Sequence, residues 1–184
     1  MHHLDRPATE PSTLKDARDA GCESWDEFKS QQKKPVQDAL LLMQNFHCAY
    51  CECALDEHEG HIEHFRRKNK KIHPELTFIW ENLFYSCCNP NTCGRHKDAH
   101  YQSKADYSIL IDPCKDNPED FMVFDQYGQI GPCENLSPVD QNRAEMTIRL
   151  FNLKDARLTI DRRDNQKKYS WLKDYPELVD SYLA

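Results

Sequence analysis

Six of the nine cysteines fall in two clusters about 40 residues apart: Cys48, Cys51 and Cys53, then Cys87, Cys88 and Cys93. In a chain without a secretory signal, clustered cysteines hold a metal more often than they form disulfides. Two close pairs can supply the four tetrahedral ligands of a structural Zn²⁺ and join two distant segments. We predict Cys48, Cys51, Cys87 and Cys93 as zinc ligands, with a slight preference for Cys87 over Cys88; buried core thiols are the alternative. Cys22, Cys114 and Cys133 are taken as ordinary thiols.

An acid and an imidazole stand side by side between the two clusters, at Glu63-His64, and Asn82 follows them. Hydrolysis of a phosphodiester needs a base that activates water, a hard divalent cation and a group that orients the base. Glu63 offers an oxygen to the cation, His64 a nitrogen to water, and Asn82 an amide that can hold its partner. Taken singly, His64 could be a structural histidine, Asn82 a turn cap, and His61 a further metal ligand or a surface residue. Their order between two cysteine pairs favours the catalytic interpretation.

This order resembles the HNH (ββα-metal) nuclease family. The family pattern is C-x2-C, an acid–His pair, Asn-Leu, and a second cysteine pair that ends in a lysine, here Lys97. The resemblance implies that His64 is the general base, that Glu63 binds the catalytic cation, and that Asn82 positions the loop carrying the base. It also implies an α+β fold in which helices surround a zinc-bound ββα-metal core.

A closer similarity covers nearly the whole chain. The segments CAYCE, IEHFR, IDPCKDNPEDF and TIRLFNLKDARLTIDRR look like those of the retron- and Septu-associated HNH proteins, the PtuB-like group. The resemblance implies an effector nuclease of anti-phage defence that works beside an ABC/SMC-like (PtuA-like) ATPase. Its substrate is expected to be DNA rather than RNA, although tRNA and other RNA stay open. A zinc-knuckle binding module without catalysis is the alternative.

One position departs from the family pattern. HNH proteins place the last ligand of the catalytic metal directly after the final cysteine, where this chain has Gly94. We assign the role to His96, with Asn89, Asn91 and His100 as alternatives. A site with few protein ligands and several waters suits Mg²⁺, and Mn²⁺ is the other cation expected.

Charge is distributed unevenly along the chain. The formal net charge is −7, yet residues 61–104 carry eight Lys and Arg against four Asp and Glu. A net negative protein binds a bare polyanion poorly, so we expect a partner to hold the substrate. The predicted docking surfaces are residues 1–13 and the helices after Ser137, including the apolar positions Ile148, Phe151, Leu158 and Trp171, for which packing within the domain is the alternative.

The 184 residues fit one domain, divided into an N-terminal arm and helices (1–46), the zinc and catalytic core (47–104) and a C-terminal β element with helices (105–184). We predict helices from near Leu14, capped by Ser12 or Thr13, over 35–46, from Pro138 to about Phe151, and from Lys154 onward. Strands are expected in YSILI (107–111), FMVF (121–124) and from Ile130, with a turn at 126–129. No apolar run reaches the ~18–20 residues of a membrane span, and no secretory leader is visible, so a cytoplasmic protein without membrane contact is expected.

Overall fold

The chain folds as an α+β structure in which two small antiparallel sheets lie among α-helices. The computed structural model describes residues 1–68, 73–100 and 107–175. Its helices are α1 (Ser12–Asp19), α2 (Ser30–Met43), α3 (Cys93–His100), α4 (Pro138–Leu150) and α5 (Ala156–Lys168). Its strands are β1 (Gly60–His64), β2 (Leu83–Cys87), β3 (Met122–Phe124) and β4 (Ile130–Pro132).

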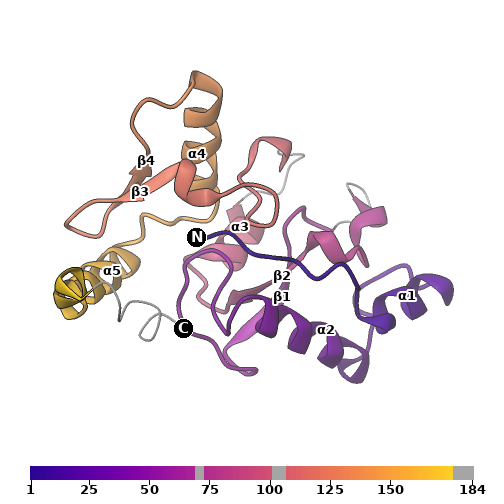
Figure 1. Cartoon of the computed structure of the whole chain (residues 1–184). Coiled ribbons are helices and arrows are strands. Elements are labelled where there is room, and N and C mark those ends of the chain that lie inside the picture. The colour runs from indigo at the N-terminus through magenta and orange to yellow at the C-terminus, as the bar shows by residue number, and fades with distance from the viewer. Residues whose placement is uncertain (69–72, 101–106, 176–184) are drawn as a thin grey trace.

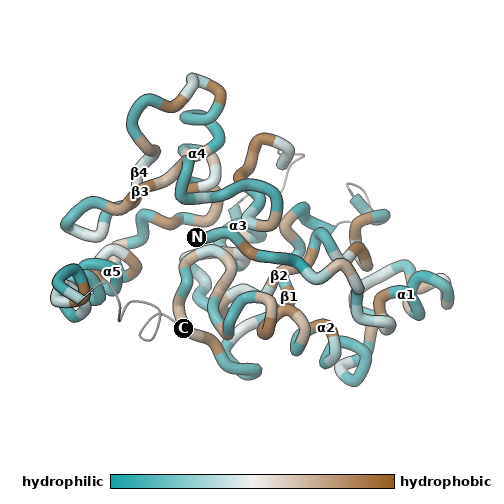
Figure 2. The backbone as a smooth tube through the Cα atoms, viewed as in Figure 1, coloured by the Kyte–Doolittle hydropathy of each residue, from teal (hydrophilic) through white to brown (hydrophobic). Residues whose placement is uncertain are grey.

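The β1–β2 sheet occupies the middle of the molecule, with α1 and α2 on one side and β3, β4, α4 and α5 on the other (Figure 1). Its register runs from Gly60 opposite Cys87 to His64 opposite Leu83. Every residue of β2 is buried, and hydrophobic segments gather where α2 meets this sheet (Figure 2). Helix α3 follows β2 closely and packs against it. The chain therefore places a strand pair and a short helix next to one another at its centre.

A side chain closes the outer edge of β2. The Gln44 amide donates to the Tyr85 carbonyl at 2.8 Å and accepts from the Tyr85 N–H at 2.7 Å. Ala49 N–H also donates to the Tyr85 carbonyl, at 3.1 Å. These bonds satisfy backbone groups that an open sheet edge would leave exposed. The turn after α2 is thereby fixed against β2.

The first two helices begin earlier than predicted. Helix α1 starts at Ser12, and neither predicted cap side chain bonds the helix end. Helix α2 starts at Ser30 and not at Pro35, so residues 31–34 belong to its first turns and Pro35 lies inside it. The reason is a cap at Lys29, whose backbone N–H donates to the Gln32 side chain at 2.9 Å. Pro35 removes one hydrogen bond, and it lies at an exposed position where water can satisfy the freed carbonyl.

The C-terminal part confirms most of the predicted elements and corrects one. The β3–β4 pair, its turn, and helices α4 and α5 form where the sequence predicts them, and the Ser137 hydroxyl caps α4 by accepting from the Asp140 N–H at 3.1 Å. The strand predicted at 107–111 is wrong. Residues Tyr107–Ile109 form a 3₁₀ turn, and the Ile111 N–H donates to the Thr147 hydroxyl of α4 at 3.0 Å. The Thr147 side chain thus accepts the backbone hydrogen bond that a neighbouring strand would accept in a sheet.

Among the described residues, no helix combines the length and the apolar character needed to cross a bilayer.

Candidate active site and metal centre

The four cysteines predicted as zinc ligands are brought together by the fold. Cys48 and Cys51 lie in the turn after α2, Cys87 ends β2, and Cys93 begins α3. Their sulfur atoms all lie within 4.8 Å of one another, and Cys51 Sγ is 3.9 Å from Cys87 Sγ. A tetrahedral zinc with bonds of about 2.3 Å requires sulfurs about 3.8 Å apart. The cluster therefore has the ligand type, number and spacing to hold a metal such as zinc.

Two further cysteines lie outside this cluster. Cys53 is exposed and its sulfur lies 3.5 Å from Cys51 Sγ. Cys88 is exposed and its sulfur lies 3.8 Å from Nδ1 of His61. Since successive strand residues point to opposite faces, Cys87 and Cys88 cannot both reach the same centre. The structure brings Cys87, and not Cys88, to the other sulfurs.

Glu63 is a buried carboxylate that faces α3. It is 2% exposed and pairs with the ammonium of Lys97, which is fully buried. Its Oε2 lies 3.6 Å from Nε2 of His61, two residues earlier on the same strand. Burial opposes ionisation, but the charge of Lys97 and the hydrogen bond from His61 lower the pKa of Glu63 to about 2. The carboxylate is consequently ionised at neutral pH.

Glycine at position 94 gives this carboxylate its space. A Cβ atom on Gly94 would lie 2.6 Å from Oε2 of Glu63, closer than side-chain atoms tolerate. The position at which the family pattern has a metal ligand therefore carries no side chain, and Glu63 fills the volume instead. Lys97, one helical turn later, supplies the charge that keeps Glu63 there.

His64 is held in one orientation at the end of β1. It is 4% exposed, its Nε2 lies 2.9 Å from the Thr77 carbonyl, and the Trp25 ring meets it edge-on at 4.7 Å. A carbonyl only accepts, so Nε2 carries the hydrogen and Nδ1 keeps the lone pair. Burial and the charge of Lys68 lower the pKa of His64 to about 3, which leaves the ring neutral at pH 7. The imidazole can therefore accept a proton at Nδ1.

Asn82 ties the loop after β1 to the segment before β2. Its Oδ1 accepts from the Arg66 N–H at 2.8 Å, and its Nδ2 donates to the carbonyls of Arg66 and Leu76 at 2.9 and 3.2 Å. Arg66 lies two residues after His64, and Leu76 directly precedes Thr77, whose carbonyl accepts the hydrogen bond from His64. The amide thus fixes both sides of the imidazole.

A hollow of about 600 Å³ opens next to Glu63 and His64, and its lining includes His61, Trp25, Lys68 and Arg95. The structure does not bring His96 to this hollow. Nδ1 of His96 lies 3.0 Å from the Leu150 carbonyl of α4, and its ring lies beside His100. The face of α3 that meets Glu63 is formed by Gly94 and Lys97, and a residue between them on the helix points elsewhere. The histidine nearest Glu63 is His61, which strand alternation could have identified, since residues i and i+2 share a face.

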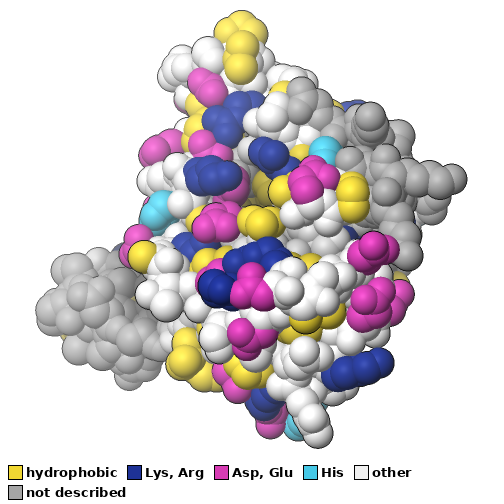
Figure 3. Space-filling model, turned by 90° about the vertical axis from the view of Figure 1, so that its right-hand side faces the viewer, with side chains coloured by type: hydrophobic (Ala, Val, Ile, Leu, Met, Phe, Trp, Pro, Cys, Tyr) yellow, Lys and Arg dark blue, Asp and Glu magenta, His cyan; other side chains and the backbone are white. Residues whose placement is uncertain are grey.

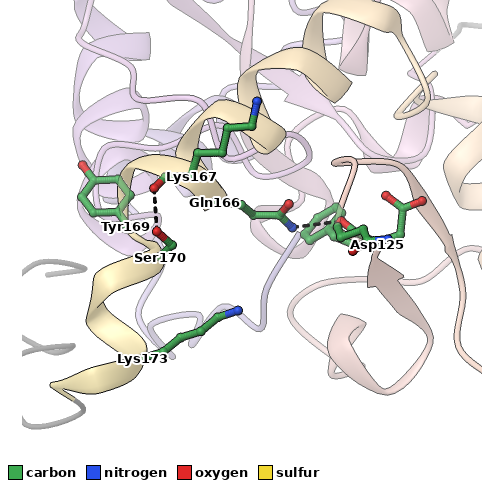
Figure 4. A pocket seen from close by; sticks show the side chains of 8 residues that line it. Asp125, Gln166, Lys167, Tyr169, Ser170 and Lys173 are labelled. Carbon is green, nitrogen blue, oxygen red and sulfur yellow. Dashed lines mark hydrogen bonds between the residues drawn. The ribbon is translucent and has the colours of Figure 1, made fainter.

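A second hollow, of about 650 Å³, lies between the β3–β4 turn and the end of α5 (Figure 4). Gln166 donates to the Asp125 carbonyl at 3.1 Å across it, and Ser170 bonds the Lys167 carbonyl at 2.9 Å. Its lining holds lysines and amides but no histidine or cysteine. Of these two hollows, the first is the one lined by histidines.

The N-terminal arm packs against the site's supporting segment. Arg6 donates to the carbonyls of Trp80 and Leu83 at 2.8 and 2.9 Å, and Leu4 N–H donates to the Pro113 carbonyl at 2.8 Å. Met1 and Leu4 are buried. The apolar positions predicted to dock a partner are also mostly internal: Ile148, Phe151 and Leu158 are buried, while Trp171 is 37% exposed. Ile148, Phe151 and Leu158 therefore serve the chain's own core and are not free to dock a partner.

No family model matches the chain. It is 32% identical over 130 residues to Septu protein PtuB of Bacillus thuringiensis, an alignment that covers 69% of this chain and 48% of that protein. It is 29% identical over 160 residues to Septu protein PtuB of Bacillus mycoides, covering 73% and 52%. It is 28% identical over 179 residues to a protein of Escherichia coli named Retron Ec83 putative HNH endonuclease, covering 76% and 69%. The chain spans about half the length of the two PtuB proteins, and it is similar to PtuB-like and HNH proteins over 69% to 76% of its own length.

Proposed function

We propose that this chain is a metal-dependent HNH nuclease that hydrolyses phosphodiesters of nucleic acid. The observation that carries the proposal is the pairing of an ionised Glu63 with a neutral, oriented His64 at one hollow, beside a four-cysteine cluster. In this proposal β1, β2 and α3 are the ββα-metal core. The names of the relatives support a nuclease of this kind.

The chain's own residues divide the work. Thr77 accepts the hydrogen of His64 Nε2, so the lone pair of Nδ1 is directed away from that bond and can take a proton from water. Asn82 holds the loops on either side, which keeps the base from rotating as it becomes charged. Lys68 lines the same hollow, and its charge disfavours protonation of His64. Its ammonium can bind the scissile phosphate and hold it in place for the attack by water.

Glu63 is the residue that would hold a catalytic Mg²⁺ or Mn²⁺, with His61 beside it. An ionised carboxylate oxygen 3.6 Å from an imidazole nitrogen suits a hard or borderline divalent cation. When bound, the cation would neutralise charge on the phosphate and the leaving oxygen. We expect His61→Ala to weaken Mn²⁺ binding, measured by the electron paramagnetic resonance of free Mn²⁺, and His96→Ala to leave it unchanged. Weakening by His96→Ala alone would restore His96 as the ligand.

A zinc-stapled binding module without catalysis is the second candidate. The buried Glu63–Lys97 pair favours it, because a carboxylate already satisfied by an ammonium has no need of a cation. The two candidates differ in one result. A module would bind nucleic acid or protein with or without Mg²⁺ and would never cut.

We further propose that the chain works with an ABC/SMC-like, PtuA-like ATPase in anti-phage defence and that DNA is preferred over RNA. The net charge of −7 supports a partner that holds the substrate. The test combines the purified chain with the ATPase and scores plasmid DNA, single-stranded DNA and tRNA with Mg²⁺, Mn²⁺ or EDTA. Cleavage that needs the cation and His64, and that increases with the ATPase, is expected. If no cleavage occurs under any condition, the binding module without catalysis is the function that remains.

A further inference from the structure

The hollow at Glu63 and His64 continues past Trp25 into a third hollow. The neighbouring hollow, of about 320 Å³, shares Trp25, His61 and Ile62 with it and extends to Lys33 of α2. Strand β1 forms the floor of both. The segment between α1 and α2 forms one wall, and α3 forms the opposite wall at Arg95. Together the two hollows make a groove that crosses the site.

Two ammonium groups flank the ring of Trp25 within this groove. Nζ of Lys33 lies 5.3 Å and Nζ of Lys68 lies 5.4 Å from the ring centroid. The ring itself is 8% exposed and backs His64, so it supports the lysine side chains and the base and leaves little surface for stacking. Burial lowers the pKa of both lysines, which shows that each ammonium has lost part of its hydration.

These lysines differ from their neighbours in lacking a carboxylate partner. Within residues 1–68, 73–100 and 107–175, no ion pair involves Lys33, Lys68 or Arg95, whereas Lys34 pairs with Asp38 and Glu57. The face drawn in Figure 3 shows Lys and Arg interspersed with Asp and Glu, so positive charge alone does not mark a binding site on that face. Asp26 and Asp98 lie near these lysines without pairing directly with them. Partly desolvated cations that no carboxylate contacts, beside the Glu63–His64 pair, form a site for anions spaced along a polymer.

We infer that the segment between α1 and α2, together with the first turn of α2, is the second wall of the substrate groove, and that Lys33 and Lys68 bind nucleic-acid phosphates next to the one presented to Glu63 and His64. This inference rests on the proposed function. It adds substrate contacts from outside the region that carries the family motifs, since Trp25 and Lys33 precede Cys48. The contacts are to phosphate, so they add affinity without sequence preference.

The test measures binding and not cutting. The full chain with His64→Ala, together with the ATPase, is titrated onto fluorescently labelled single-stranded and duplex DNA at increasing salt. Lys33→Gln and Lys68→Gln are compared with Lys34→Gln, a matched control that removes one positive charge from the next residue of the same helix. Each loss of a phosphate contact should weaken binding and reduce the slope of log K against log salt by about 0.7 for single strands and about 0.9 for duplex.

The results distinguish the substrate groove from the nuclease activity on which it rests. Reduced affinity and slope for Lys33→Gln and Lys68→Gln, with Lys34→Gln like the parent, support the groove. If Lys33→Gln behaves like Lys34→Gln while Lys68→Gln weakens binding, the second wall is overturned and the nuclease proposal stands. If the parent complex binds no nucleic acid, both fail.

Discussion

Two adjacent residues at the start of α3 belong to two different kinds of centre. Cys93 joins the sulfur cluster, in which four thiols face one another and three of them are buried. Gly94 faces Glu63, whose carboxylate meets one imidazole and one ammonium and then a hollow. Structural zinc sites are closed by four protein ligands, whereas catalytic metal sites keep open positions. The comparison indicates that one helix end can stabilise the fold with one residue and make room for chemistry with the next.

The largest expected effect is on the closed centre. Cys87→Ser should abolish zinc binding and unfold the middle of the molecule, because binding to structural sites contributes about 10–16 kcal/mol in zinc-finger peptides. Cys88→Ser, at the neighbouring exposed thiol, is the control and should keep both zinc and fold. Metal analysis and circular dichroism measure the two. If the Cys87→Ser protein folds without zinc, the cysteine cluster is not a structural centre, and the distinction between the two centres is wrong.

Removing the base should act on the open centre alone. His64→Ala should reduce cleavage by about 10²–10⁴-fold, because the proton acceptor is lost, while zinc content stays at one per chain. Single-turnover cleavage and metal analysis on the same sample provide the readouts. Unchanged cleavage in this variant would move the role of base to another histidine.

Gly94→Ala tests how closely the two centres are joined. The added Cβ would displace the Glu63 carboxylate, and overpacking of this kind costs about 1–3 kcal/mol. We expect lower thermal stability and weaker Mn²⁺ binding with zinc retained, since Cys93 is not altered. If zinc is lost as well, the two centres at the start of α3 do not act independently.

The smallest effect is a dependence of stability on pH. The unfolded chain binds a proton at His64 below the ordinary pKa of 6.5, whereas the folded chain resists until about pH 3. The unfolded state therefore holds more protons in this window, and stability falls as the pH falls from 6.5 toward 3. Between pH 7 and 5.5 the loss should be about 1 kcal/mol. Urea unfolding of the parent and of His64→Ala should show that the variant lacks this part of the decline; equal slopes would contradict the low pKa.

Local signals in the sequence were sufficient where a side chain acts on its own neighbours. Ser137 caps the helix that follows it, Asn152 ends that helix with a positive φ of 47°, and the Asp125 turn closes the β3–β4 pair. The close spacing of cysteines in each pair likewise predicted the four thiols that the fold assembles.

Signals failed where a distant partner decided the outcome. The apolar run ending at Ile111 has strand composition, yet Thr147 of α4 takes its backbone hydrogen bond. His96 stands close to the expected ligand position, but helical geometry turns it to Leu150. His61 reaches Glu63 because residues i and i+2 of a strand share a face. Ile148, Phe151 and Leu158 pack in the chain's own core, since apolar content indicates how much surface is buried and not which partner buries it.

The contacts of the N-terminal arm have a consequence for how the molecule folds. Leu4 bonds to Pro113, more than a hundred residues later in the chain, and Arg6 bonds to Trp80 and Leu83, 74 and 77 residues later. Contacts of such long sequence separation are entropically costly to close and form late in folding. We therefore expect the segment that carries Asn82 to become fully rigid only late in folding.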